Sequence, residues 1–188
     1  KDGQACGLAE QIDDLDALRT HLGFSKIDLL GHSWGGYLVM AYAARHPDRI
    51  AHLVIVDSAA PKIQDTVFLF KNIYPETTVR EDALAFAVEL GDEKAIPADL
   101  REYMTMLFYT AEARDAFLAR SKSFVYRQKV NKAVWSDLQR FDLNPELPKF
   151  RFPVLVVTGR YDFNVAPSVA WSIHRAIPGS ELAVFEKS

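Results

Sequence analysis

The sequence contains a single cysteine, Cys6, among its 188 residues, so no disulfide can form within the chain. Such sparse cysteine use is typical of proteins from a reducing compartment, and we expect a cytoplasmic location. No apolar run has the length of a membrane-spanning helix, so we expect no membrane partner. The formal net charge is only −3, which provides no electrostatic basis for binding nucleic acid.

The sequence also lacks the usual patterns of cofactor sites. Its histidines and acidic residues show no tight metal-ligand spacing, and no glycine-rich dinucleotide fingerprint follows a strand pattern. We therefore expect neither a metal nor an organic cofactor. Hydrophobic residues make up 49% of the chain and charged residues 25%, as in an ordinary globular domain.

The most informative stretch of the chain is residues 31–35, which read Gly-His-Ser-Trp-Gly. This is the G-x-S-x-G pattern of a nucleophilic serine on a tight turn between a strand and a helix. The flanks fit that geometry, because residues 27–30 read as a short buried strand and residues 36–44 favour a helix. We predict that Ser33 is a nucleophile and that the backbone N–H of Trp34 donates to the developing oxyanion.

The glycines of this turn have a predicted steric role. A serine at the point of a sharp turn adopts a strained backbone conformation, and its neighbours must be small so that chains can pass closely. We expect Gly31, Gly35 and Gly36 to provide that space. We also expect the turn to direct the side chain of His32 into the core.

Helix and strand patterns alternate on both sides of a long helical block. Within the block, helices are predicted over residues 80–90, 97–108, 111–120 and 130–141. The flanking parts contain strand patterns at 52–57, 154–158 and 182–185 and helix patterns at 8–22 and 165–177. This order predicts an α/β fold with a mainly parallel sheet, whose core comprises residues 1–60 and 142–188, and an inserted all-helical cap at residues 61–141.

The serine turn, the late strand that ends in Gly159-x-x-Asp162 and the helical insertion resemble the α/β-hydrolase superfamily. Residues 31–36, residues 45–49 (Arg-His-Pro-Asp-Arg) and residues 177–182 (Ile-Pro-Gly-Ser-Glu-Leu) are similar to the proline iminopeptidase branch and its esterase-like relatives. The resemblance runs through nearly the whole chain. It implies a serine hydrolase that cleaves an ester or amide bond of a small molecule or short peptide through an acyl-enzyme.

The resemblance also implies the partners of Ser33. Asp162 corresponds to the acid that orients the catalytic histidine, and Asp57 is the alternative, because some family members carry the acid after the preceding strand. The family takes its histidine from a Gly-His step after the last strand, which here would lie just beyond Ser188. No histidine in the chain is predicted to be the base; the five are His21, His32, His46, His52 and His174.

Family members open with several strands and a His-Gly-Gly-Pro-like loop that supplies the second oxyanion N–H. Nothing of that kind precedes Ser33, so the strand at 27–30 would lie at a sheet edge with unpaired backbone groups. We therefore expect a piece of a longer polypeptide, with the missing half of the sheet supplied by the rest of that polypeptide or by another chain. A stable, compact monomer of the isolated 188 residues would contradict this expectation.

Several functions stay open within the resemblance. A proline iminopeptidase-like aminopeptidase would bind the free amine of its substrate with acidic cap residues, for which Glu102, Glu112 and Asp115 are candidates. Residues 126–132 are basic where such enzymes carry a glutamate-containing stretch, which keeps a carboxylesterase or lactonase open. A truncated, non-catalytic binding module is the remaining alternative. An epoxide hydrolase or dehalogenase is disfavoured, because those enzymes have aspartate at the position of Ser33.

Overall fold

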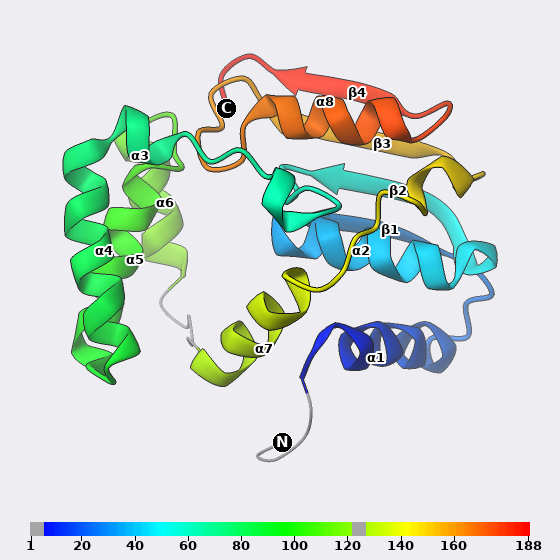
Figure 1. Cartoon of the computed structure of the whole chain (residues 1–188), viewed down its shortest axis with the longest axis horizontal. Coiled ribbons are helices and arrows are strands. Elements are labelled where there is room, and N and C mark those ends of the chain that lie inside the picture. Colours follow the sequence, from blue (N-terminus) through cyan, green and yellow to red (C-terminus); the bar gives the residue numbers. More distant parts are fainter. Residues whose placement is uncertain (1–5, 122–126) are drawn as a thin grey trace.

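The computed structural model describes residues 6–121 and 127–188. Its centre is a four-stranded parallel sheet with the strand order β1-β2-β3-β4 (Figure 1). The strands are β1 (Ile27–His32), β2 (Ile50–Val56), β3 (Val154–Gly159) and β4 (Glu181–Phe185). The parallel α/β core predicted from the alternating patterns is therefore present.

Helices α2 (Trp34–Arg45) and α8 (Pro167–Ala176) lie over the same face of the sheet (Figure 1). Each helix connects two neighbouring parallel strands, and both connections advance across the sheet in the same direction. Because such crossovers are right-handed, the two helices fall on one face. Helix α1 (Leu8–His21) packs outside α2, where Asp13 forms an ion pair with Arg45 at 3.0 Å.

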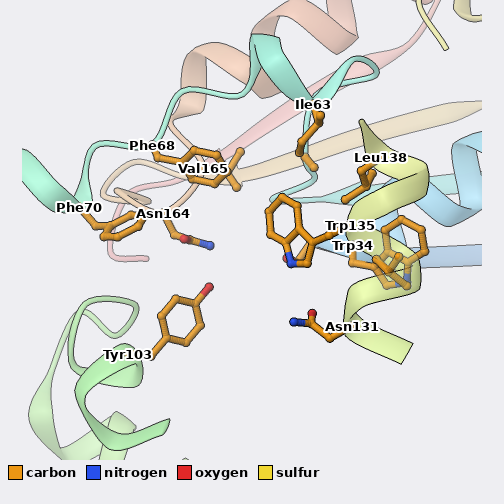
Figure 2. A pocket seen from close by; sticks show the side chains of 13 residues that line it. Trp34, Ile63, Phe68, Phe70, Tyr103, Asn131, Trp135, Leu138, Asn164 and Val165 are labelled. Carbon is orange, nitrogen blue, oxygen red and sulfur yellow. The ribbon is translucent and has the colours of Figure 1, made fainter. Parts of the chain in front are cut away.

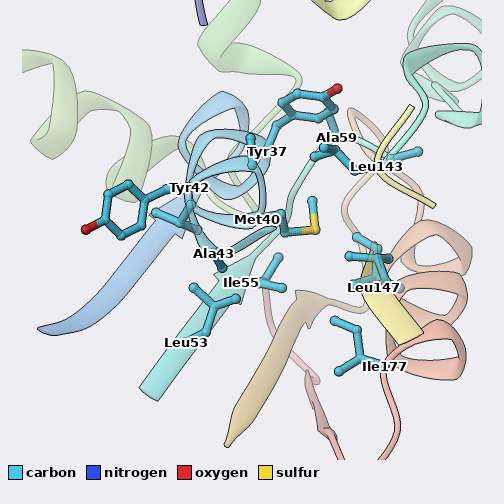
Figure 3. Packing of buried hydrophobic residues seen from close by; sticks show 14 of the residues in the cluster. Tyr37, Met40, Tyr42, Ala43, Leu53, Ile55, Ala59, Leu143, Leu147 and Ile177 are labelled. Carbon is cyan, nitrogen blue, oxygen red and sulfur yellow. The ribbon is translucent and has the colours of Figure 1, made fainter. Parts of the chain in front are cut away.

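The hydrophobic core lies between the sheet and these helices. Leu53 and Ile55 of β2 have no exposed surface, and neither do Tyr37, Met40 and Tyr42 of α2 (Figure 3). Burial of this apolar face sets the position of α2 against the sheet, because moving the helix would expose its large side chains to water. The same packing fixes the position of Trp34, the first residue of α2.

Between β2 and β3 the described residues form helices, and we call residues 61–141 the helical segment. Its α-helices are α3 (Phe70–Ile73), α4 (Pro75–Glu89), α5 (Ile96–Thr105), α6 (Ala111–Arg120) and α7 (Gln128–Leu138). Short 3₁₀ turns occupy Pro47–Arg49, Ile63–Asp65, Glu93–Ala95 and Leu147–Lys149. The helix predicted over 80–90 begins earlier, at Pro75, since proline suits the first turn of a helix.

The two ends of the helical segment meet beside the sheet. Lys62 forms an isolated antiparallel bridge with Asp142, and the N–H of Leu143 donates to the carbonyl of Pro61 at 2.9 Å. Figure 1 shows α3–α6 on the side toward which the strand arrows point, whereas α7 lies closer to α1 and α2. The division of the chain into two core parts and a cap stays a prediction.

Strand β1 lies at an edge of this sheet, and its two faces differ. Alternation along the strand directs Leu29 toward the core and Leu30 to the opposite face, where Leu30 is 67% exposed. The prediction that His32 points into the core is wrong: His32 is exposed, because the alternation places Gly31 on the side of α2. The prediction that another segment completes the sheet stays a prediction.

Across the described ranges, no helix has both the length and the apolar character needed to cross a bilayer.

Candidate active site

Ser33 lies at the turn between β1 and α2, and its backbone φ is 55°. This left-handed region is unfavourable for a residue with a side chain, so it is kept only where the surroundings impose it. Backbone hydrogen bonds hold the turn: the Ser33 N–H donates to the Val56 carbonyl at 3.0 Å, and the Ser33 carbonyl accepts the N–H groups of Gly36 at 3.0 Å and Tyr37 at 3.4 Å. The strand-turn-helix predicted around Ser33 is present, with the strained serine at its point.

Two of the three glycines in this turn are sterically required. A Cβ atom on Gly31 would lie 2.1 Å from the carbonyl oxygen of Gly35, and one on Gly36 would lie 2.4 Å from the Cβ of Ser58. A Cβ atom on Gly35 would meet nothing within 4 Å. The prediction that all three provide space is therefore wrong for Gly35. Close approach of backbone to backbone explains Gly31, and packing of the turn on the segment after β2 explains Gly36.

Trp34 is the first residue of α2, where backbone N–H groups have no acceptor within the helix. Its ring stacks on Tyr37, with ring centres 5.8 Å apart. The Tyr37 hydroxyl donates to the carbonyl of Phe141 at 3.4 Å and so joins α2 to the helical segment. Burial, together with the charges of Asp142 and Asp137, raises the pKa of Tyr37 to about 12, so this hydroxyl keeps its proton at neutral pH.

The two candidate acids follow neighbouring strands. Asp162 comes after β3, and its Oδ1 accepts the backbone N–H groups of Asn164 at 2.9 Å and Val165 at 2.8 Å. Asp57 comes after β2 with a φ of 40°, and its Oδ1 accepts the N–H of Gly159 at 3.0 Å. Because β2 and β3 are adjacent and parallel, both carboxyl groups lie at the same edge of the sheet. The two acids that the sequence offers as alternatives are neighbours.

Their proximity changes the acidity of Asp162. The pKa of this carboxyl is raised to about 7, with burial as the largest cause. The charge of Asp57 and a hydrogen bond with its side chain also contribute to this rise, whereas the N–H groups of Val165 and Asn164 act in the opposite direction. A positively charged partner next to Asp162 would lower this pKa again, because it would stabilise the carboxylate.

Ser33 lies in the wall of a cavity of about 480 Å³, a volume suited to a small molecule (Figure 2). The cavity lies between the carboxyl ends of the strands and the helical segment. Its lining consists of Ser33, Trp34, Ala59, Ile63, Phe68, Phe70, Tyr103, Asn131, Val134, Trp135, Leu138, Asn164 and Val165. The wall is mainly apolar and aromatic, with polar groups at only a few points.

The predicted amine ligands of the helical segment do not line this cavity. Glu102 forms an ion pair with Arg80 at 3.2 Å, Asp115 forms one with Arg114 at 2.9 Å, and Glu112 is exposed. Glu112 and Asp115 therefore lie on a solvated helix face, and the partly buried Glu102 is paired with Arg80. The sequence analysis did not identify the polar residues that do line the cavity, which are Tyr103, Asn131 and Asn164. No local pattern marks them, since their position depends on how distant segments pack.

None of the histidines in the described residues lines the cavity. The Nδ1 atom of His52 lies 2.7 Å from Asp28, and that of His174 lies 2.9 Å from the hydroxyl of Ser180. His46 ends α2, and His21 and His32 are exposed. Within residues 6–121 and 127–188, no group of three or more His, Cys, Asp or Glu side chains is arranged to hold a metal ion.

The sequence profile of the alpha/beta hydrolase fold matches residues 3–188, nearly the entire chain. The chain belongs to the alpha/beta hydrolase fold family. A curated relative is a proline iminopeptidase of Saccharolobus solfataricus, which is 28% identical over an alignment that covers 94% of this chain and 60% of the relative.

Solved structures of alpha/beta hydrolases superpose well on this chain. An alpha/beta fold family hydrolase from Bacillus anthracis str. Sterne has a TM-score of 0.80 at 24% identity, over 97% of this chain and 67% of that one. An esterase from Exiguobacterium antarcticum has a TM-score of 0.72 at 24% identity, over 98% of this chain and 67% of the esterase. The chain thus spans between 60% and 67% of the length of these three proteins.

The paired acids of this alpha/beta hydrolase predict how its stability depends on pH. The pKa of Asp162 is higher in the folded state than the value of about 4 expected in the unfolded chain, so the folded state binds more protons between about pH 4 and about pH 7. The free energy of unfolding should therefore fall as the pH rises through this window. Replacing Asp57 with asparagine removes a charge that raises the Asp162 pKa, and its amide oxygen can still accept the Gly159 N–H. We expect this variant to lose less stability over the window.

A histidine next to Asp162 would mask this effect, so the measurement uses the full-length protein in which the histidine expected just beyond Ser188 is replaced by alanine. Urea unfolding of this parent variant at about pH 4.5 and about pH 7.5 measures the effect. The exposed Asp48 provides a matched control, since Asp48→Asn removes the same charge away from Asp162. Equal pH dependence with and without Asp57→Asn would contradict the expected coupling.

Proposed function

We propose that this chain carries the nucleophile and the acid of a serine hydrolase that cleaves an ester or amide bond through an acyl-enzyme. The observation that carries the proposal is Ser33, held in a strained turn at the start of α2 and in the wall of a cavity. Strain of this kind persists where a side chain must be presented in one direction. The polarity of α2 favours negative charge at this point.

The proposed reaction assigns a role to each neighbour. The hydroxyl oxygen of Ser33 attacks the substrate carbonyl while a histidine removes its proton, and the Trp34 N–H donates to the resulting oxyanion. The intermediate collapses as the histidine gives this proton to the leaving alcohol or amine, which leaves the acyl group on Ser33. Water, deprotonated by the same histidine, then attacks the acyl-enzyme, and the Ser33 oxygen leaves with that proton to release the acid. Asp162 orients the imidazole and balances its charge. We propose that this histidine comes from the segment after β4. The carbonyl of Ser188 accepts the N–H of Tyr161 at 2.8 Å, which puts that segment beside the loop of Asp162.

We further propose that the helical segment acts as the cap of this site. Tyr103 of α5 and Trp135 and Leu138 of α7 line the cavity that contains Ser33. A substrate in the cavity would be enclosed between these side chains and the ends of the strands.

The proposed cytoplasmic location rests on the single cysteine alone.

The cavity wall favours a neutral acyl group over a free amine. Among the described residues that line the cavity there is no carboxylate, and burying an unpaired ammonium group in an apolar wall is costly. A carboxylesterase or lactonase therefore fits better than an aminopeptidase. The relative named as a proline iminopeptidase keeps that activity as the second candidate. The basic stretch at residues 126–132 begins outside the described residues.

A substrate panel tests this proposal on the full-length protein. We expect p-nitrophenyl esters of short neutral acids to be hydrolysed faster than prolyl and other aminoacyl anilides at equal concentration. Preference for the anilides would favour the aminopeptidase. No turnover of either class, with no initial burst of nitrophenol, would contradict the hydrolase and favour a binding module.

A further inference from the structure

At one end of the cavity, a polar group from the helical segment faces one from the core. Tyr103 enters from α5, and Asn164 comes from the loop after β3, two residues beyond Asp162. Figure 2 shows the Tyr103 hydroxyl directed toward the side-chain amide of Asn164, whose nitrogen atom is on the side of the amide that faces Tyr103. The surrounding lining residues Phe68, Phe70 and Val165 are apolar.

The environment of Tyr103 keeps its hydroxyl neutral. Burial raises the pKa of the phenol, a hydrogen-bonding interaction with Asn164 lowers it, and the charges of Glu81 and Asp162 raise it. The phenol of Tyr103 and the side-chain amide of Asn164 can each donate a hydrogen bond, so both offer a hydrogen to an acceptor in the cavity.

We infer that Tyr103 and Asn164 determine acyl specificity by recognising an oxygen acceptor in a neutral acyl group bound in the cavity. The inference rests on the proposed function, because the acyl group is the one that Ser33 would receive. In an apolar wall, a donor without an acceptor costs free energy, so an acyl chain that brings an oxygen to this point gains over its hydrocarbon analogue. An anionic acyl group would be repelled here by Glu81 and Asp162.

Matched esters test this inference on the full-length protein. The pairs are p-nitrophenyl 4-oxopentanoate with p-nitrophenyl pentanoate, and 5-oxohexanoate with hexanoate, which differ by one ketone oxygen at equal chain length. We expect kcat/KM of the wild type to favour at least one oxo-ester by about tenfold, the value of one good hydrogen bond. Tyr103→Phe should reduce this ratio to about one. Tyr109→Phe, which removes the hydroxyl of a tyrosine outside the cavity lining, should leave the ratio unchanged.

A binding measurement separates failure of the inference from failure of the proposed function. In a Ser33→Ala background, ethyl 4-oxopentanoate and ethyl pentanoate are titrated while the fluorescence of Trp34 and Trp135 in the cavity wall is followed. The oxo-ester should bind about tenfold more tightly, and Tyr103→Phe should remove the difference. Turnover with equal ratios in the wild type and Tyr103→Phe would overturn the inference and leave the hydrolase standing. Absent turnover would overturn the hydrolase, while the binding ratio would still decide the role of Tyr103.

Discussion

Replacing Ser33 with alanine is expected to reduce kcat for the best ester of the full-length protein by a factor of about 10⁴ to 10⁶. The variant loses the only atom that can form the acyl-enzyme in the proposed reaction. The cavity and the Trp34 N–H would remain, and these account for the residual rate expected above the uncatalysed reaction. The same variant should fail to react with a fluorophosphonate probe that labels the wild-type protein.

A second serine provides the matched control for this experiment. Ser172 lies exposed on α8, and its hydroxyl donates to the carbonyl of Ser168 at 2.9 Å. Ser172→Ala should keep both the labelling and the ester hydrolysis. Labelling that persists in Ser33→Ala, or an unlabelled wild type, would show that Ser33 is not the nucleophile.

Replacing Gly31 with alanine is expected to destabilise the protein by about 3 kcal/mol. The new Cβ atom would lie 2.1 Å from the Gly35 carbonyl oxygen and 2.7 Å from the Gly36 nitrogen, so it could be accommodated only by moving backbone. Movement of β1 away from α2 would also disturb the buried contacts of Tyr37 and Met40 with the sheet. Urea unfolding followed by circular dichroism measures the loss.

Gly35→Ala is the matched control, four residues away in the same turn. Its Cβ atom meets nothing within 4 Å, and alanine is favoured over glycine within a helix by about 1 kcal/mol. The free energy of unfolding should therefore stay the same or increase slightly. Similar losses in the two variants would contradict the steric explanation, even though both glycines belong to the G-x-S-x-G pattern.

Local sequence patterns predicted the local structure well. The apolar run before Ser33, the serine between glycines and the helix-forming residues after it lie next to one another in the chain, so their interactions could be anticipated. The same local reading failed for His32, because the face of a strand on which a side chain lies depends on register with the neighbouring elements. It also failed for the start of α4, because the helix begins at Pro75, five residues before the predicted start at residue 80.

Long-range arrangement set the limits of prediction for the site. Asp57 and Asp162 could be found as separate candidates after two strands, but their coupling follows from the pairing of β2 with β3. Glu102 was a reasonable amine ligand by residue type, yet its helix turns it toward Arg80 instead of the cavity. The orientation of a helix about its own axis is determined by the surfaces that it buries, and those surfaces come from other parts of the chain.

By itself the sequence determined the parallel α/β core and the strained serine turn, because each depends on residues that are close in the chain or on a regular alternation of apolar positions. Only the tertiary structure decided which side chains surround Ser33. Tyr103 and Asn164 are far apart in sequence, and they meet because the helical segment leaves and returns to the sheet at Lys62 and Asp142 and folds over its carboxyl edge. Contacts of this kind arise from packing between segments, which leaves no pattern in either one.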